Sequence, residues 1–204
     1  MSEFDDKAAT WNENPERAER AAIFAKIIRN QIDLSQVEMA MEYGSGTGLL
    51  SFALAKDLED ITLMDESGAM IKEVDDKCEN LDIVHFHPIQ YDLMKDGLPE
   101  HKFDLIYTAM TLHHVDDTNG ILNKFQEVLN PGGHIVLIDL VAEDGSFHNF
   151  EFDGHLGFAK EDLERKIQIN GFALVSYQIA YTVTAERGGE MRDYPLFLLV
   201  AKKN

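Results

Sequence analysis

The chain of 204 residues has a single cysteine, Cys78. One cysteine excludes an internal disulfide and any metal site built from several cysteines. No apolar run approaches the ~20 residues that a membrane-spanning helix needs, and the acidic, polar start MSEFDDKAATW is unlike a secretory signal. These absences favour a protein of a reducing, cytoplasmic setting that does not insert into a membrane.

Positive charge is also scarce. The chain carries 18 lysine and arginine residues against 37 aspartate and glutamate residues, which gives a net charge of −19. A surface this acidic repels a phosphate backbone, and the longest cationic runs are pairs such as Lys202–Lys203. We therefore expect no nucleic-acid partner. The oligomeric state stays open.

Apolar runs alternate with helical stretches along the chain. Such an alternation predicts a parallel sheet covered by helices on both faces. Two final strands, with no helix between them, predict an antiparallel hairpin at one edge of the sheet. The expected fold is a doubly wound α/β three-layer sandwich of seven strands, mostly parallel with one antiparallel edge strand, in a single domain over 1–204. The strands are expected at 37–42, 60–65, 82–87, 102–110, 134–142, 172–183 and 194–202, with a loop at 184–193.

The stretch MEYGSGTGLL, residues 41–50, follows the first expected strand and opens a helix. The dinucleotide fingerprint requires G-x-G-x-x-G, but here the glycines are Gly44, Gly46 and Gly48, and Leu49 stands where the third fingerprint glycine belongs. A pyrophosphate also requires positive potential at this turn, which Glu42 would oppose. A cofactor with an ammonium group would instead gain from Glu42, and S-adenosylmethionine has one, with no phosphate.

Two further acidic residues follow strand ends that meet the same edge of the expected sheet. Asp65 is the last residue of the second strand, where a carboxylate can accept both hydroxyls of a ribose. Asp92 follows the third strand and could accept the exocyclic amine of adenine. The alternative for Asp92 is a solvated acidic residue in a loop.

Taken together, MEYGSGTG, LMDESGAMI, QYDL, FDLIYTAMTLHHVDD and LNPGGHIVLIDL resemble the motifs of class I S-adenosylmethionine-dependent methyltransferases. Within that class the chain resembles the small-molecule branch that includes quinone-biosynthesis enzymes (methyltransferase type 11). The resemblance implies a cofactor site along the ends of the first four strands, with S-adenosylhomocysteine as the product. The residues that it implies are Gly44, Ser45 and Gly46 for the methionine part, Asp65, Glu66 and Met70 for the ribose and adenine, Asp92 and Leu93 for the adenine edge, and Ala109 for the pocket wall.

A sulfonium is already an activated methyl donor, so the enzyme mainly has to align the acceptor and exclude water. A general base is needed only if the acceptor arrives protonated. His114, just after the fourth strand, is the best candidate for a catalytic contact. The alternative is a histidine hydrogen-bonded to backbone at a junction between elements.

Two segments are candidates for substrate contacts. The loop 141–158 is polar and glycine-rich, and its His148 and His155 are expected to face the substrate; an ordinary surface loop is the alternative. In the small-molecule enzymes that the chain resembles, the N-terminal region covers the cofactor, so residues 1–35 are expected to form a lid and helix that place Trp11 at the site. The alternative is that Trp11 packs the first helix against the body of the domain. Asp139, His148 and His155 match no recognised metal-binding spacing, so no metal site is predicted.

Other functions fit the same motifs. The chain could bind S-adenosylmethionine without turnover and regulate a partner, because fold and cofactor do not fix function. It could methylate protein or RNA, although its charge disfavours RNA. An NAD-dependent oxidoreductase is disfavoured by Glu42 and by the missing fingerprint glycine.

Overall fold

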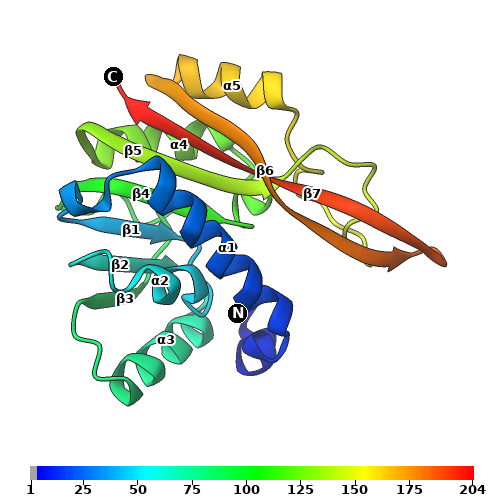
Figure 1. Cartoon of the computed structure of the whole chain (residues 1–204), viewed down its shortest axis with the longest axis horizontal. Helices are drawn as coiled ribbons and strands as arrows, with labels where there is room; N and C mark the ends of the chain where they lie inside the picture. Colours follow the sequence, from blue (N-terminus) through cyan, green and yellow to red (C-terminus); the bar gives the residue numbers. More distant parts are fainter. Residues whose placement is uncertain (1–3) are drawn as a thin grey trace.

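The computed structural model describes residues 4–204. Its centre is a seven-stranded sheet in the order β3-β2-β1-β4-β5-β7-β6 (Figure 1). All neighbouring strands pair in parallel except at β7, which is antiparallel to β5 and β6. The strands are β1 (Ala40–Tyr43), β2 (Ile61–Asp65), β3 (Phe86–Gln90), β4 (Phe103–Ala109), β5 (Leu129–Leu140), β6 (Phe172–Arg187) and β7 (Glu190–Lys203). The predicted sandwich is confirmed, with the hairpin β6–β7 at the sheet's edge.

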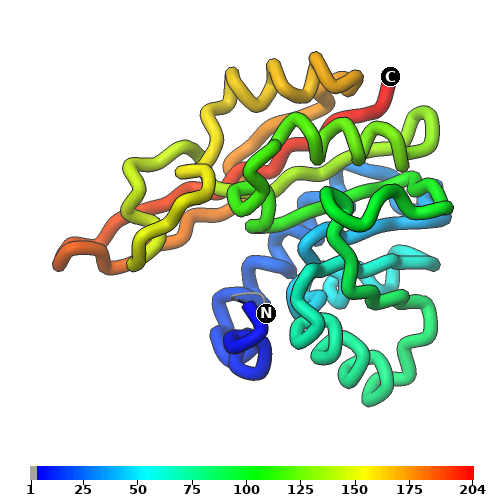
Figure 2. Tube along the Cα trace, turned by 180° about the vertical axis from the view of Figure 1, so that it is seen from behind, coloured from blue at the N-terminus to red at the C-terminus, as the bar shows by residue number. Residues whose placement is uncertain are grey.

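Helices cover both faces of the sheet. One buried cluster joins it to α1 (Pro15–Gln31), α2 (Leu49–Leu54) and α3 (Gly68–Asn80), and a second joins its other face to α4 (Thr118–Val128) and α5 (Lys160–Ile169). The view from behind shows α4 and α5 in front of the sheet (Figure 2). Short 3-10 helices, η1 (Asp5–Glu13), η2 (Leu34–Gln36) and η3 (Leu112–His114), complete the set. Within residues 4–204, no helix combines the length and apolarity needed to cross a bilayer.

Local sequence signals explain where the helices begin. The Asn14 side chain accepts a hydrogen bond from the Glu16 amide, and Pro15 occupies the first helical position of α1. Ser67 caps α3 and Asp117 caps α4 in the same manner. Each cap satisfies an amide that has no partner within its helix.

The predicted loop at 184–193 is wrong. Strands β6 and β7 pair continuously up to Arg187 and Glu190, and only Gly188 and Gly189 turn the chain. Both glycines have positive φ, 60° and 86°, as a two-residue hairpin turn requires. The hairpin extends beyond the rest of the sheet (Figure 1), where the exposed Glu186 alternates with Val183 and Ala185, which pack against the core cluster. The high share of charged residues makes this stretch read as a loop.

The third strand also lies later than predicted. Residues 82–85 precede β3, and Asp82 has a positive φ of 53°. The strand begins at Phe86 because its register with β2 pairs Phe86 with Ile61 and Gln90 with Asp65. Pro88, which has no amide to donate, is tolerated because β3 is an edge strand.

The strand order reverses between β1 and β4. The sheet continues from β1 to β2 and β3 on one side, and from β4 to β5 on the other. Ligands of doubly wound folds bind outside the carboxyl ends of the strands at such a switch point. The turns after β1, β2 and β4 therefore face one crevice, and they carry the residues that the sequence singles out.

Candidate functional site

A cavity of about 850 Å³ opens at this switch point. Its lining joins the carboxyl ends of the central strands to the N-terminal segment and to the loop after β5. The predicted site residues that line it are Trp11, Glu42, Gly44, Ser45, Gly46, Asp65, Glu66, Met70, Asp92, Ala109, His114 and His148. Two predicted residues lie elsewhere: the Leu93 side chain is buried in the core cluster under α4, and His155 is described below.

The turn after β1 is shaped for a close backbone approach. Gly44, Gly46 and Gly48 all have positive φ, between 52° and 74°, a region that residues with a Cβ resist. A Cβ at Gly44 would overlap the side chain of Thr111. The Ser45 hydroxyl is buried without a hydrogen-bond partner among the described residues, so a polar ligand group in this turn would satisfy it.

Asp65 ties this turn to the start of α3. One carboxylate oxygen accepts the Gly46 amide at 2.7 Å, and the other accepts the Ser67 amide at 2.8 Å. Burial raises the pKa of Asp65, while the two amides oppose that shift. A carboxylate oxygen can accept more than one hydrogen bond, so the fixed group has capacity left for ribose hydroxyls.

Glu42 lies beneath the turn. Side chains alternate along β1, so Met41 and Tyr43 enter the cluster under α4 while Glu42 points toward α2. Its carboxylate accepts the amide and the hydroxyl of Ser51, and the Ser51 hydroxyl also lies 2.6 Å from that of Tyr107. Burial raises the pKa of Glu42 to about 8, with Asp65 adding a smaller repulsion. Glu42 is thus protonated at neutral pH unless a cation joins it.

The residues expected near adenine form a more open wall. Lys95 lies 2.8 Å from Asp92 and 3.5 Å from Glu66. The Asp92 side chain also accepts the Met94 amide at 2.8 Å, which fixes the loop after β3. Met70, 1% exposed, provides an apolar surface beside them.

The N-terminal segment closes one side of the cavity. The Thr47 hydroxyl donates to Asn12 at 2.7 Å, and the Ser67 hydroxyl donates to Asp5 at 2.6 Å. These bonds connect η1 to the glycine turn and to α3. Trp11 Nε1 lies 3.9 Å from the position of a Cβ on Gly46, so the tryptophan lies over the turn. That this segment acts as a lid stays a prediction.

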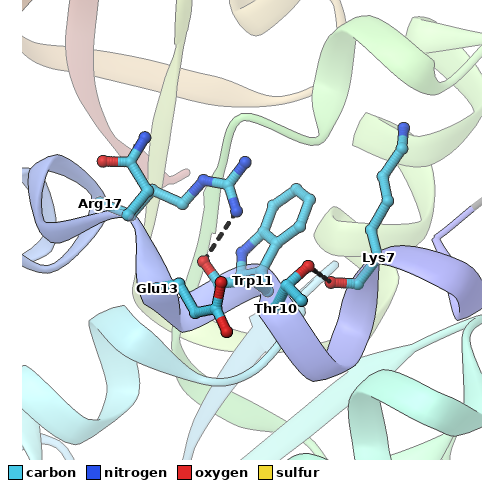
Figure 3. A pocket seen from close by; sticks show the side chains of 6 residues that line it. Lys7, Thr10, Trp11, Glu13 and Arg17 are labelled. Carbon is cyan, nitrogen blue, oxygen red and sulfur yellow. Dashed lines mark hydrogen bonds between the residues drawn. The ribbon is translucent and has the colours of Figure 1, made fainter.

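A smaller hollow of about 420 Å³ lies against the same segment. Figure 3 shows Trp11 there between Arg17 and Lys7, with the hydrogen bond from Arg17 to the Trp11 carbonyl. The Arg17 guanidinium carbon stands 3.7 Å from the centre of the indole ring. Lys7, Trp11 and Arg17 also line the larger cavity, so we interpret this hollow as part of its rim.

Histidines gather at the other end of the cavity. The His113 ring is 2% exposed and its Nδ1 lies 2.6 Å from Asp139. The pKa of His114 is lowered to about 4, chiefly by burial and then by His113, so this imidazole is neutral at neutral pH. The His148 ring stacks on Phe152 with the centroids 3.8 Å apart. His155 instead turns toward the carbonyls of 115 and 116.

The cavity wall also contains Arg20, a residue of α1 that the sequence analysis did not select. Burial lowers its pKa and Arg17 adds to that shift, while Tyr181, Glu16 and Asp139 oppose it. Within residues 4–204 its guanidinium forms no hydrogen bond or ion pair. A half-buried cation without a direct partner is costly, and no local signal in the sequence indicates it.

Comparisons with known proteins agree with this geometry. Residues 41–137 match the family described as "Methyltransferase domain". An uncharacterized methyltransferase of Mycobacterium bovis is 27% identical over 104 residues, which is 51% of each protein. The N-methyltransferase NodS of Bradyrhizobium japonicum superimposes with a TM-score of 0.66 at 19% identity, covering 94% of this chain and 98% of NodS. The [4+2]-cyclase SpnF gives 0.73 at 15% identity, covering 89% and 80%.

The family match makes residues 41–137 a methyltransferase domain by similarity, and the fold and the glycine turn agree with the predicted resemblance to class I S-adenosylmethionine-dependent methyltransferases. S-adenosylmethionine is the cofactor that this similarity supports. The solved structures support the fold alone, since their sequences are distant. The match spans about half the length (51%) of the Mycobacterium bovis relative, so the acceptor and the roles of single residues are matters for proposal.

Proposed function

We propose that the protein transfers a methyl group from S-adenosylmethionine to a small-molecule acceptor by in-line displacement. The observation that carries this proposal is that one cavity of about 850 Å³ is lined both by the glycine turn and by His114 and Arg20. This volume is in the upper part of the ~300–1,000 Å³ range of ligand pockets. A cavity of this size would hold an acceptor beside the cofactor. A reducing, cytoplasmic setting agrees with the lone buried Cys78.

The bound cofactor would supply a methyl group already activated by its sulfonium. In our assignment, Gly44 and Gly46 let the backbone approach the methionine part, and Glu42 balances the ammonium. Asp65 accepts the ribose hydroxyls, and Asp92 accepts the adenine amine. Trp11 covers the turn and excludes water, which strengthens each of these interactions.

The acceptor end of the cavity suggests the charge of the acceptor. Within residues 4–204 Arg20 forms no direct ion pair, and Glu16 and Asp139 act on it only at a distance. An acceptor carboxylate or phosphate would pair with it and offset its desolvation. We therefore expect an acceptor with an anionic group, held with its nucleophile toward His114.

Incubation with methyl-labelled S-adenosylmethionine and a cell extract, followed by separation by size, tests the proposal. We expect the label in the low-mass fraction. An anion-exchange column should then retain the labelled product, because the acceptor carries an anionic group. Label in protein would instead support the protein methyltransferase alternative. Tight cofactor binding without any labelled product would favour a regulatory binder, or a reaction other than methyl transfer such as the cyclisation in the name of SpnF, which shares this fold.

A further inference from the structure

Three histidines from two separate segments meet in the cavity. His113 and His114 follow β4, and His148 comes from the loop after β5. One ring nitrogen of each lies within 4.8 Å of the corresponding nitrogens of the other two. All three residues line the cavity, so a bound ion would face the space left for the acceptor.

Asp139 lies directly behind this cluster. Its side chain is fully buried, and its two carboxylate oxygens lie 2.6 Å from His113 Nδ1 and 3.1 Å from the His113 amide. A carboxylate in this position fixes Nδ1–H as the donor, which leaves Nε2 with its lone pair available. Metal-binding histidines almost always donate their other ring N–H to a carboxylate, a backbone carbonyl or a water molecule.

The third histidine is held by its neighbours. Phe152 stacks against His148 with an interplanar angle of 20°. The carbonyl of Phe147 accepts hydrogen bonds from the Arg187 guanidinium at 2.6 and 2.9 Å. The outer part of the hairpin β6–β7, which the sequence predicted to be a loop, thus supports the loop that carries His148.

We propose that His113, His114 and His148 bind one divalent transition-metal ion, with Zn²⁺ as the best match. Three imidazoles with a fourth position open to a cavity match the pattern of catalytic zinc sites, and an all-nitrogen set disfavours Mg²⁺ and Ca²⁺. Nitrogens at zinc-ligand distance are ~3.3 Å apart in a tetrahedron, so the widest pair would close by at most about 1.5 Å on binding.

The sequence pattern could not reveal this site, since the ligands are separated by a helix and a strand. The proposal also changes the role of His114, which would be a metal ligand and not a base. An open coordination position here would orient an acceptor oxygen or sulfur and favour its deprotonated form. The binding of metal itself does not depend on the proposed methyl transfer.

Cobalt titration of tag-free, chelator-treated protein tests the site. We expect about one Co²⁺ per chain with the visible absorption of low-coordinate nitrogen ligation, displaced by Zn²⁺ and insensitive to Mg²⁺. His148→Ala should weaken Co²⁺ at least about tenfold, and Asp139→Asn by about 10- to 100-fold. His101→Ala, in an exposed loop, is the matched control and should bind as the wild type does.

His148 is the first choice for substitution because it lies on a loop, and circular dichroism would confirm that each variant is folded. Equal Co²⁺ affinity in the wild type and in folded His148→Ala would overturn the proposal. Failure of the wild type to take up Co²⁺ or Zn²⁺ would overturn it as well. Because the readout is metal binding, either result stands whether or not methyl transfer is observed.

Discussion

The raised pKa of Glu42 gives a quantitative prediction for cofactor binding. Without a cation nearby, burial keeps this carboxyl protonated up to about pH 8. The ammonium of S-adenosylhomocysteine would favour the carboxylate and bring its pKa back toward the ordinary value. Binding below about pH 8 must therefore release a proton, so affinity rises with pH. The charged group that acts on Glu42 is Asp65. The pKa of Tyr107 is raised well above its usual value, so this tyrosine stays neutral below about pH 8.

The expected size follows from proton linkage. If the pKa of Glu42 falls from about 8 to about 4.5 in the complex, the dissociation constant decreases about 20-fold between about pH 6 and about pH 7.5, or roughly 1.8 kcal/mol. Staying at or below pH ~7.5 keeps the ammonium of the ligand mostly charged, since an α-amino group titrates near ~7.7–8. The Glu42→Gln variant keeps the shape of the side chain and removes the proton exchange.

Isothermal titration calorimetry in two buffers of different ionisation enthalpy measures both quantities. The wild type should release close to one proton per S-adenosylhomocysteine near pH 6.5 and show the affinity increase. Glu42→Gln should bind weakly with almost no pH dependence. A variant that keeps the wild-type slope would refute the pairing of Glu42 with the ammonium. The same shift has a consequence for folding: the contribution of Glu42 to stability is fully present below about pH 4.5 and is lost as pH rises through about 8.

Three further substitutions test other parts of the site. Asp65→Ala should weaken S-adenosylhomocysteine by ~1.5–3 kcal/mol, the worth of a charged hydrogen bond; unchanged affinity by calorimetry would remove the ribose assignment. Arg20→Gln should raise the KM for an anionic acceptor about 10- to 150-fold, whereas Arg165→Gln on the surface of α5 should leave it unchanged; equal effects would argue against the anion contact. Gly44→Ala should lower the free energy of unfolding by about 1–3 kcal/mol more than Gly97→Ala. Both glycines have positive φ, but only Gly44 has a neighbour in the way, so similar melting temperatures would contradict the close contact.

The cofactor end of the site could be predicted because its signals are local. Gly44 and Gly46 follow the strand that they terminate, and Asp65 is itself the end of a strand. In a parallel sheet the carboxyl ends meet at one edge, so position along the chain translates directly into position in space. Twelve predicted residues line the cavity, although lining alone does not establish their roles.

The acceptor end could not be predicted because it is assembled from distant segments. Arg20 comes from α1, His113 follows β4 and His148 lies beyond β5. Nothing in their spacing indicates that they share a wall. His155, predicted to face the substrate, has its ring nitrogen 3.0 Å from the Val115 carbonyl. Tertiary contacts of this kind decide between two histidines of one loop, and the sequence alone cannot rank them.

A crystal structure with S-adenosylhomocysteine bound tests the central claim most directly. We predict ribose hydroxyls within hydrogen-bond distance of the Asp65 carboxylate, the ammonium beside Glu42, and the sulfur directed toward the part of the cavity lined by Arg20 and His114. A ligand bound with its sulfur directed away from that space, or outside the cavity at the glycine turn, would contradict the account.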